Sequence, residues 1–160
     1  WQQRPESLGF VNIKSNDPFE APIIQPNYLE AEEDRKVLIA GMKLARRLMR
    51  TEPLEPYFDF EQYPGDHIQT DDELLQIARE RGTTTFHVMG SCRMGPSSDP
   101  TSVVNEKLGV HGIDGLRVID ASIMPTMLSA NLNAGAMMIG EKGADMILGK
   151  PALEPIITHE

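Results

Sequence analysis

Residues 116–147, LRVIDASIMPTMLSANLNAGAMMIGEKGADMI, decide how the rest of the chain is interpreted. The stretch opens with an apolar run that ends on a carboxylate, Asp120. A segment with Pro125, serines and asparagines follows, and the stretch closes with small and apolar residues at helical spacing. This order predicts a strand, a crossing loop and a helix. An acid beside a helix start would suit polar, electron-rich ligand atoms, whereas the plainer interpretation is a packed strand and helix with Asn133 as N-cap.

Composition limits the classes of function. With 160 residues, 40% of them hydrophobic, the chain can bury the core of one domain. No apolar run approaches the roughly 20 residues that cross a bilayer, and no secretory leader is visible. A net charge of −9 argues against nucleic-acid binding, because neutralising phosphates needs clustered Lys and Arg. Because the chain begins at Trp1 with the lead-in to a strand, we expect it to be a fragment of a longer protein.

Cysteine and histidine usage predicts no metal site. Cys92 is the single cysteine, so neither an intrachain disulfide nor a cysteine-based zinc cluster can form. The four histidines lack the spacing of paired metal ligands. A single thiol is compatible with a reducing compartment. We expect a cytoplasmic location, with the periphery of the inner membrane as the alternative.

Periodicity and turn residues predict the elements that precede the deciding stretch. Residues 9–15 alternate as a strand does, and the prolines near 22–26 indicate an irregular, extended connection. A helix is expected over 32–50, with acids at its start and a solvated arginine cluster at its end. Residues 51–69 form a long surface segment that could cover a pocket. A capping box at 70–73 predicts a second helix over 71–81.

The remaining segments are predicted to be short. Residues 83–86 are β-prone and would deliver His87 at a strand end, and 103–104 and 108–110 would extend around a turn. His87 is the best acid–base candidate, because imidazole titrates near neutrality, although a lone histidine is more often structural. Cys92 is expected to be a small buried residue rather than a nucleophile, and the methionines, including Met137 and Met138, are expected in the core.

Two segments together carry a resemblance to a known family. Residues 86–95, FHVMGSCRMG, resemble the histidine segment of the glucose–methanol–choline (GMC) flavin oxidoreductases. The family's C-terminal signature resembles VHG at 110–112, GLRVIDASIMP at 115–125, NLN at 131–133 and MIGEK at 138–142. The likeness covers residues 9–148 and is greatest for the choline-dehydrogenase-like branch. Val88 and Ser91 depart from it, since many members have Pro and Thr at these positions.

The resemblance implies a role for individual residues. His87 matches the histidine that helps remove the alcohol proton while a hydride passes to flavin N5. Asn131 falls where the family has a second His or Asn that hydrogen-bonds the substrate oxygen. Asp120, with the backbone from Ala121 onward, matches the acid segment that holds FAD. Leu132 and Asn133 lie where the backbone at a helix start faces the flavin pyrimidine edge.

The resemblance also implies a fold class, domains and partners. It implies an α+β protein in which a mixed or antiparallel sheet packs with helices and one strand–helix unit belongs to the FAD-binding sheet. Residues 1–150 would be the family's C-terminal domain and 151–160 a tail. The implied cofactor is FAD, and the implied reaction oxidises a choline-like or other primary alcohol to an aldehyde. The implied partners are the alcohol, an N-terminal FAD-binding portion of the same enzyme, and quinone or oxygen as electron acceptor.

Two alternatives stay open at this point. The same scaffold hosts hydroxynitrile lyases, in which FAD is structural. The chain could also be an inactive, flavin-free module, because the glycine-rich fingerprint GxGxxG, which holds the ADP half of FAD in the family, is absent from it.

Overall fold

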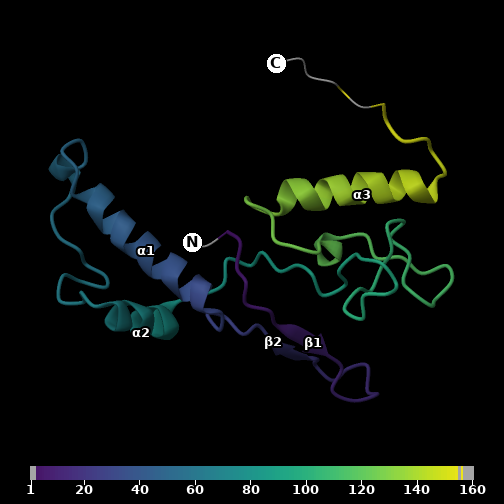
Figure 1. The fold of residues 1–160 in the computed structure, drawn as a ribbon, viewed down its shortest axis with the longest axis horizontal. Helices are drawn as coiled ribbons and strands as arrows, with labels where there is room; N and C mark the ends of the chain where they lie inside the picture. Colours follow the sequence, from purple (N-terminus) through teal and green to yellow (C-terminus); the bar gives the residue numbers. More distant parts are fainter. Residues whose placement is uncertain (1–2, 155, 157–160) are drawn as a thin grey trace. The chain divides into compact units, whose positions relative to one another are not determined.

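The computed structural model describes residues 3–154 and 156, and it divides the chain into two compact units between Thr85 and Phe86. Figure 1 labels the helices and strands of the two units. The described residues of the first unit form the elements β1 (Phe10–Asn12), β2 (Ile23–Gln25), α1 (Glu32–Met49), η1 (Glu55–Tyr57) and α2 (Asp71–Arg81). Those of the second form η2 (Ala121–Ile123) and α3 (Asn133–Ile147). The predicted α+β class is confirmed.

Strands β1 and β2 form an antiparallel pair in which Val11 lies opposite Ile24. The predicted strand at 9–15 is confirmed over its central residues. The expectation of an irregular connection near 22–26 is wrong, because residues 23–25 pair with β1. Three residues between two prolines are too short to show alternation, so this strand is defined by its partner rather than by its own pattern.

Helix α1 is held to the start of the chain by a buried acid. Asp34, which is 2% exposed, accepts hydrogen bonds from the backbone N–H of Glu6 (2.8 Å) and of Ser7 (2.9 Å), and from the Ser7 hydroxyl. A carboxylate is costly to bury unless its oxygens are hydrogen-bonded, and both oxygens are used here. The acidic first turn of α1 therefore also anchors the segment that leads to β1.

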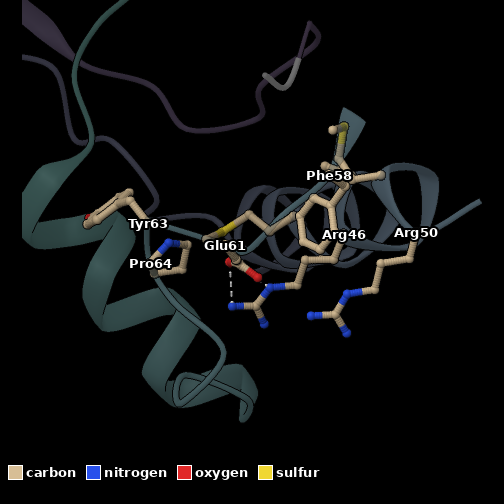
Figure 2. A pocket seen from close by; sticks show the side chains of 9 residues that line it. Arg46, Arg50, Phe58, Glu61, Tyr63 and Pro64 are labelled. Carbon is tan, nitrogen blue, oxygen red and sulfur yellow. Dashed lines mark hydrogen bonds and ion pairs between the residues drawn. The ribbon is translucent and has the colours of Figure 1, made fainter. Parts of the chain in front are cut away.

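The arginine cluster at the end of α1 is only partly solvated. The Arg46 side chain is 16% exposed and points at Glu61 (Figure 2). Its Nε and Nη2 donate to Glu61 Oε1 at 2.9 and 2.8 Å, and its Nη1 donates to the Ile68 carbonyl at 2.7 Å. The prediction of a solvated cluster is thus wrong for Arg46, which ties the 51–69 segment to α1.

The 51–69 segment covers a pocket, as predicted. This pocket of about 270 Å³ is lined by α1 and by side chains that include Phe58 and Tyr63 (Figure 2). The two arginines at its edge are already paired, Arg46 with Glu61 and Arg50 with Asp66. The pocket therefore presents an apolar surface rather than an anion site.

Helix α2 has the predicted capping box. The Glu73 backbone N–H donates to the Thr70 hydroxyl at 3.3 Å, and the Thr70 N–H donates to the Glu73 carboxylate at 2.8 Å. The helix ends before Gly82, as expected. The strand predicted at 83–86 is wrong, since these residues form no strand. Phe86 adopts a left-handed backbone (φ 59°), which does not continue an extended strand.

The second unit is built from short bridges rather than long strands. Val104 bridges Met94 in parallel and Val110 in antiparallel fashion, which confirms extended backbone at Val104 and at 109–110. The prediction is wrong for Leu108, which has a left-handed backbone (φ 65°). The strand predicted at 116–119 has a single bridge, from Arg117 to Gly109, and so is not a ladder strand. The core beneath these bridges is formed by buried side chains: Val104, Leu108, Ile123, Met124, Leu132 and Ile139.

Helix α3 packs on the segment that leads to Asp120. Its buried positions include Ile139 and Gly143, both in the predicted stripe. The helix begins at Asn133 and has Leu132 as its N-cap, so the plain interpretation of Asn133 as N-cap is wrong. Met137 and Met138 are exposed, contrary to their expected core positions. Of the described residues, no helix combines the length and the apolar character that a bilayer crossing requires.

The contact between Gly143 and Ile119 gives a test of this packing. A Cβ on Gly143 would overlap the Ile119 side chain, so Gly143→Ala should lower the free energy of unfolding by about 1–3 kcal/mol. Gly140→Ala is the matched control: its Cβ meets open space, and it should raise that free energy by about 0.5–1 kcal/mol. Urea unfolding followed by circular dichroism measures both values. Equal stability of the two variants would contradict the packing.

Candidate active site

All six residues assigned by the resemblance lie in the second unit. His87 precedes the loop that leads to Met94, Asp120 and Ala121 enter η2, and residues 131–133 lead into α3. The η2 turn packs against α3, and Figure 1 shows the turn beneath the N-terminal half of that helix. One structural unit therefore carries the candidate proton-transfer and cofactor-binding residues.

The backbone after His87 runs alongside η2. The Cys92 N–H donates to the Ser122 carbonyl at 3.0 Å, and the Met94 N–H donates to the Ile123 carbonyl at 2.8 Å. These bonds place the histidine loop beside the turn that follows Asp120. His87 itself is half-buried. The main-chain bonds that align this loop with η2 begin at Cys92, and His87 does not lie at a strand end as the sequence suggested.

Asp120 presents its carboxylate at the entry to η2. Its backbone is extended (φ −156°, ψ −173°), and its Oδ1 accepts a hydrogen bond from the Ser122 N–H at 2.8 Å. The side chain is exposed, and Oδ2 accepts no hydrogen bond from any residue that the structure describes. One oxygen therefore orients the carboxylate while the other can accept a hydrogen bond from a hydroxyl-bearing ligand.

The start of α3 differs from the starts of α1 and α2. Both of those helices have three acidic residues in the first turn, whereas α3 has none. Like α1, α3 receives no side-chain cap from the described residues. The first backbone N–H groups of a helix have no partner within the helix and carry partial positive charge. Here they stay available, with Leu132 buried and Asn131 and Asn133 exposed beside them. This helix start suits an electron-rich ligand edge.

The structure connects these segments through a residue that sequence analysis did not single out. Met124 follows η2, is 5% exposed, and lies close to Gly90 of the histidine loop and to Gly135 of α3. No hydrogen bond joins His87 to Asn131 among the described residues, so their joint action on one substrate stays a prediction. The described residues also contain no cluster of three potential metal ligands.

The Gly90 backbone gives a test of the loop. Its φ of +83° is accessible to glycine, tolerated by asparagine and unfavourable for other residues. Gly90→Val should therefore lower the free energy of unfolding by at least about 1–2 kcal/mol, and Gly90→Asn by clearly less. Thermal unfolding of the two variants shows which of them is the less stable. If valine were tolerated as well as asparagine, the left-handed conformation would be incorrect.

Comparison with known proteins identifies the family. The family model of the GMC oxidoreductases (GMC_oxred_C) matches residues 5–140, so the chain belongs to the GMC oxidoreductase family. This confirms the resemblance stated from the sequence.

Individual relatives agree with this assignment. The chain is 45% identical over 150 residues to the mitochondrial choline dehydrogenase of Homo sapiens, covering 94% of this chain and 25% of the relative. It is 42% identical over 150 residues to an oxygen-dependent choline dehydrogenase of Staphylococcus xylosus, covering 93% of this chain and 27% of the relative. An FAD-dependent oxidoreductase from Chaetomium thermophilum superposes with a TM-score of 0.86 at 30% identity, covering 92% of this chain and 26% of that structure. The chain thus spans about a quarter of the length of these proteins.

Proposed function

We propose that this chain forms the substrate-binding and proton-handling part of an FAD-dependent enzyme that oxidises an alcohol to an aldehyde. The observation that carries the proposal is the pair of backbone bonds that holds the His87 loop beside the turn after Asp120. Relatives named choline dehydrogenases support a choline-like or other primary alcohol as substrate. We further propose that a quinone or oxygen accepts the electrons and that the enzyme is cytoplasmic or peripheral to the inner membrane.

The described residues fit FAD at this site. Asp120 has one oxygen held by Ser122 and a second that can accept a hydrogen bond from a ligand hydroxyl. The acid-free start of α3 matches the electron-rich pyrimidine edge of a flavin, because unpaired N–H groups attract such atoms. In this proposal Ala121, Leu132 and Asn133 contribute backbone to the cofactor site. The remaining part of the polypeptide, about three quarters of the relatives' length, would bind the ADP half.

The candidate site residues of this chain have separate tasks in the proposed reaction. When bound, FAD supplies the hydride-accepting centre. His87 takes the proton from the substrate hydroxyl, because a neutral imidazole nitrogen can accept a proton. The Asn131 amide donates a hydrogen bond to the same oxygen and so orients the carbinol carbon. The N–H groups at the start of α3 would hold an electron-rich edge of the cofactor and would favour negative charge there.

Replacing His87 tests the proton-transfer role. In the complete enzyme with bound FAD, His87→Ala should slow flavin reduction by the alcohol by roughly 10²- to 10⁴-fold, because the hydroxyl proton loses its acceptor. Stopped-flow absorbance of the flavin band measures this rate. The exposed His67 of the first unit is the matched control, and His67→Ala should leave the rate unchanged.

The outcomes separate the open alternatives. An unchanged reduction rate in His87→Ala would remove the assigned role. A parent enzyme whose flavin is not bleached by any alcohol, yet which releases aldehyde from a cyanohydrin, would be a lyase. An isolated chain that shows no flavin absorption band after FAD is added would be the inactive module.

Replacing Asp120 tests cofactor binding. Asp120→Ala should weaken FAD retention by roughly 10- to 100-fold, because it removes a charged acceptor worth about 1.5–3 kcal/mol. Release of FAD on dilution, followed by its fluorescence, measures the effect. Asp114→Ala removes the same charge from an exposed loop in the second unit and should leave retention unchanged. Equal retention in both variants would contradict the role of Asp120.

A further inference from the structure

We propose that Met124 is a positioning residue that sets the spacing between the His87 loop and the start of α3. The inference rests on the proposed function, because it explains how the His87 loop and the start of α3 are kept at a defined separation. Met124 is a member of the core cluster, yet it lies next to every segment that carries a candidate site residue. Three separate contacts of this one residue support the proposal.

The first contact closes the turn after Asp120. The Met124 N–H donates to the Ala121 carbonyl at 3.2 Å, which ends η2. A displacement of Met124 would therefore be transmitted to the backbone that follows the Asp120 carboxylate.

The second contact is made by the Met124 carbonyl. This oxygen lies 3.4 Å from the place where a Cβ on Gly90 would be. Gly90 comes three residues after His87, and the bonds from Cys92 and Met94 to Ser122 and Ile123 continue the same alignment. The Met124 carbonyl thus lies beside the Gly90 backbone of the histidine loop.

The third contact is made by the Met124 side chain. Its Cε lies 2.9 Å from the place where a Cβ on Gly135 would be, and Leu128 Cδ1 lies 2.7 Å from the same place. Gly135 is in the first turn of α3, two residues after Asn133 and four after Asn131. The methionine side chain therefore fills the space between η2 and the helix start.

The chemistry makes this spacing important. A hydroxyl held by His87 on one side and Asn131 on the other requires the two elements at a defined separation, and a shift of about 1 Å can cost roughly 100-fold in rate. A void at Met124 would allow such a shift, because the packed neighbours relax into it only in part. Leucine restores most of the volume, since exchanges between Leu and Met conserve it.

The experiment compares two cavities in the same core in the complete enzyme with bound FAD. Met124→Ala should lower the limiting rate of flavin reduction at saturating alcohol by roughly 10- to 100-fold, while the alcohol concentration at half saturation changes little. Met124→Leu should restore most of the rate. Leu108→Ala is the matched control: Leu108 is 3% exposed and in the same cluster, and its loss should leave the limiting rate unchanged at a comparable loss of thermal stability.

A second pair of variants covers the case in which Met124→Ala does not fold. Gly135→Ala pushes a methyl group against the ends of the Leu128 and Met124 side chains, whereas Gly140→Ala in the same helix meets open space. Gly135→Ala should slow flavin reduction and Gly140→Ala should not.

The results distinguish this inference from the proposed function. The positioning role would be overturned if Met124→Ala and Leu108→Ala had equal limiting rates of flavin reduction, even if His87→Ala reduces the flavin slowly. If Met124→Ala does not fold, equal limiting rates in Gly135→Ala and Gly140→Ala would overturn it. An unaffected His87→Ala enzyme would overturn both.

Discussion

The close approach of α3 to residues 119–124 is the constraint on which the second unit depends. The Ile119 side chain occupies the space that a Cβ on Gly143 would need, and the Met124 side chain reaches Gly135 in the first turn of the helix. Because protein interiors are packed without spare volume, these two contacts hold α3 close to residues 119–124 at both Gly135 and Gly143. The start of α3 and the turn that follows Asp120 are consequently held close together. A cofactor that needs both groups at once would find them pre-arranged.

The position of the histidine loop depends on main-chain bonds, which explains how its sequence can vary. Cys92 and Met94 bond through their backbone N–H groups to carbonyls of η2, so their side chains are not needed for the alignment. Val88, where many family members have proline, is 77% exposed, and Ser91 is exposed as well. Neither departure disturbs the bonds that hold the loop. They alter the surface near His87, which is where substrate preference would be expressed.

The N-termini of the three described helices differ in whether acidic side chains lie in the first turn. In α2, hydrogen bonds from the backbone N–H of Thr70 and then of Gln69 lower the pKa of Glu73, so this carboxylate stays ionised where it caps the helix. In the first turn of α1, Asp34 instead accepts hydrogen bonds from the backbone of Glu6 and Ser7, and no side chain caps this helix among the described residues. The first turn of α3 has no acid in competition with a ligand. The start of α3 is therefore compatible with a negatively charged ligand, although the chain as a whole is acidic.

The sequence by itself determined the three described helices, because their apolar spacing and the capping box at 70–73 are local signals. It also determined the family, and with it the candidate roles of His87, Asn131 and Asp120, because ordered motifs survive without any coordinates. Local signals failed where structure depends on distant partners. Residues 23–25 became a strand only by pairing with β1, and 83–86 and 116–119 did not form the ladder strands that their β-prone residues suggested. Only the tertiary structure decided that Arg46 is held by Glu61 and that Met124 lies between Gly90 and Gly135, because these contacts join residues 11 to 34 positions apart, and no periodicity encodes such distances.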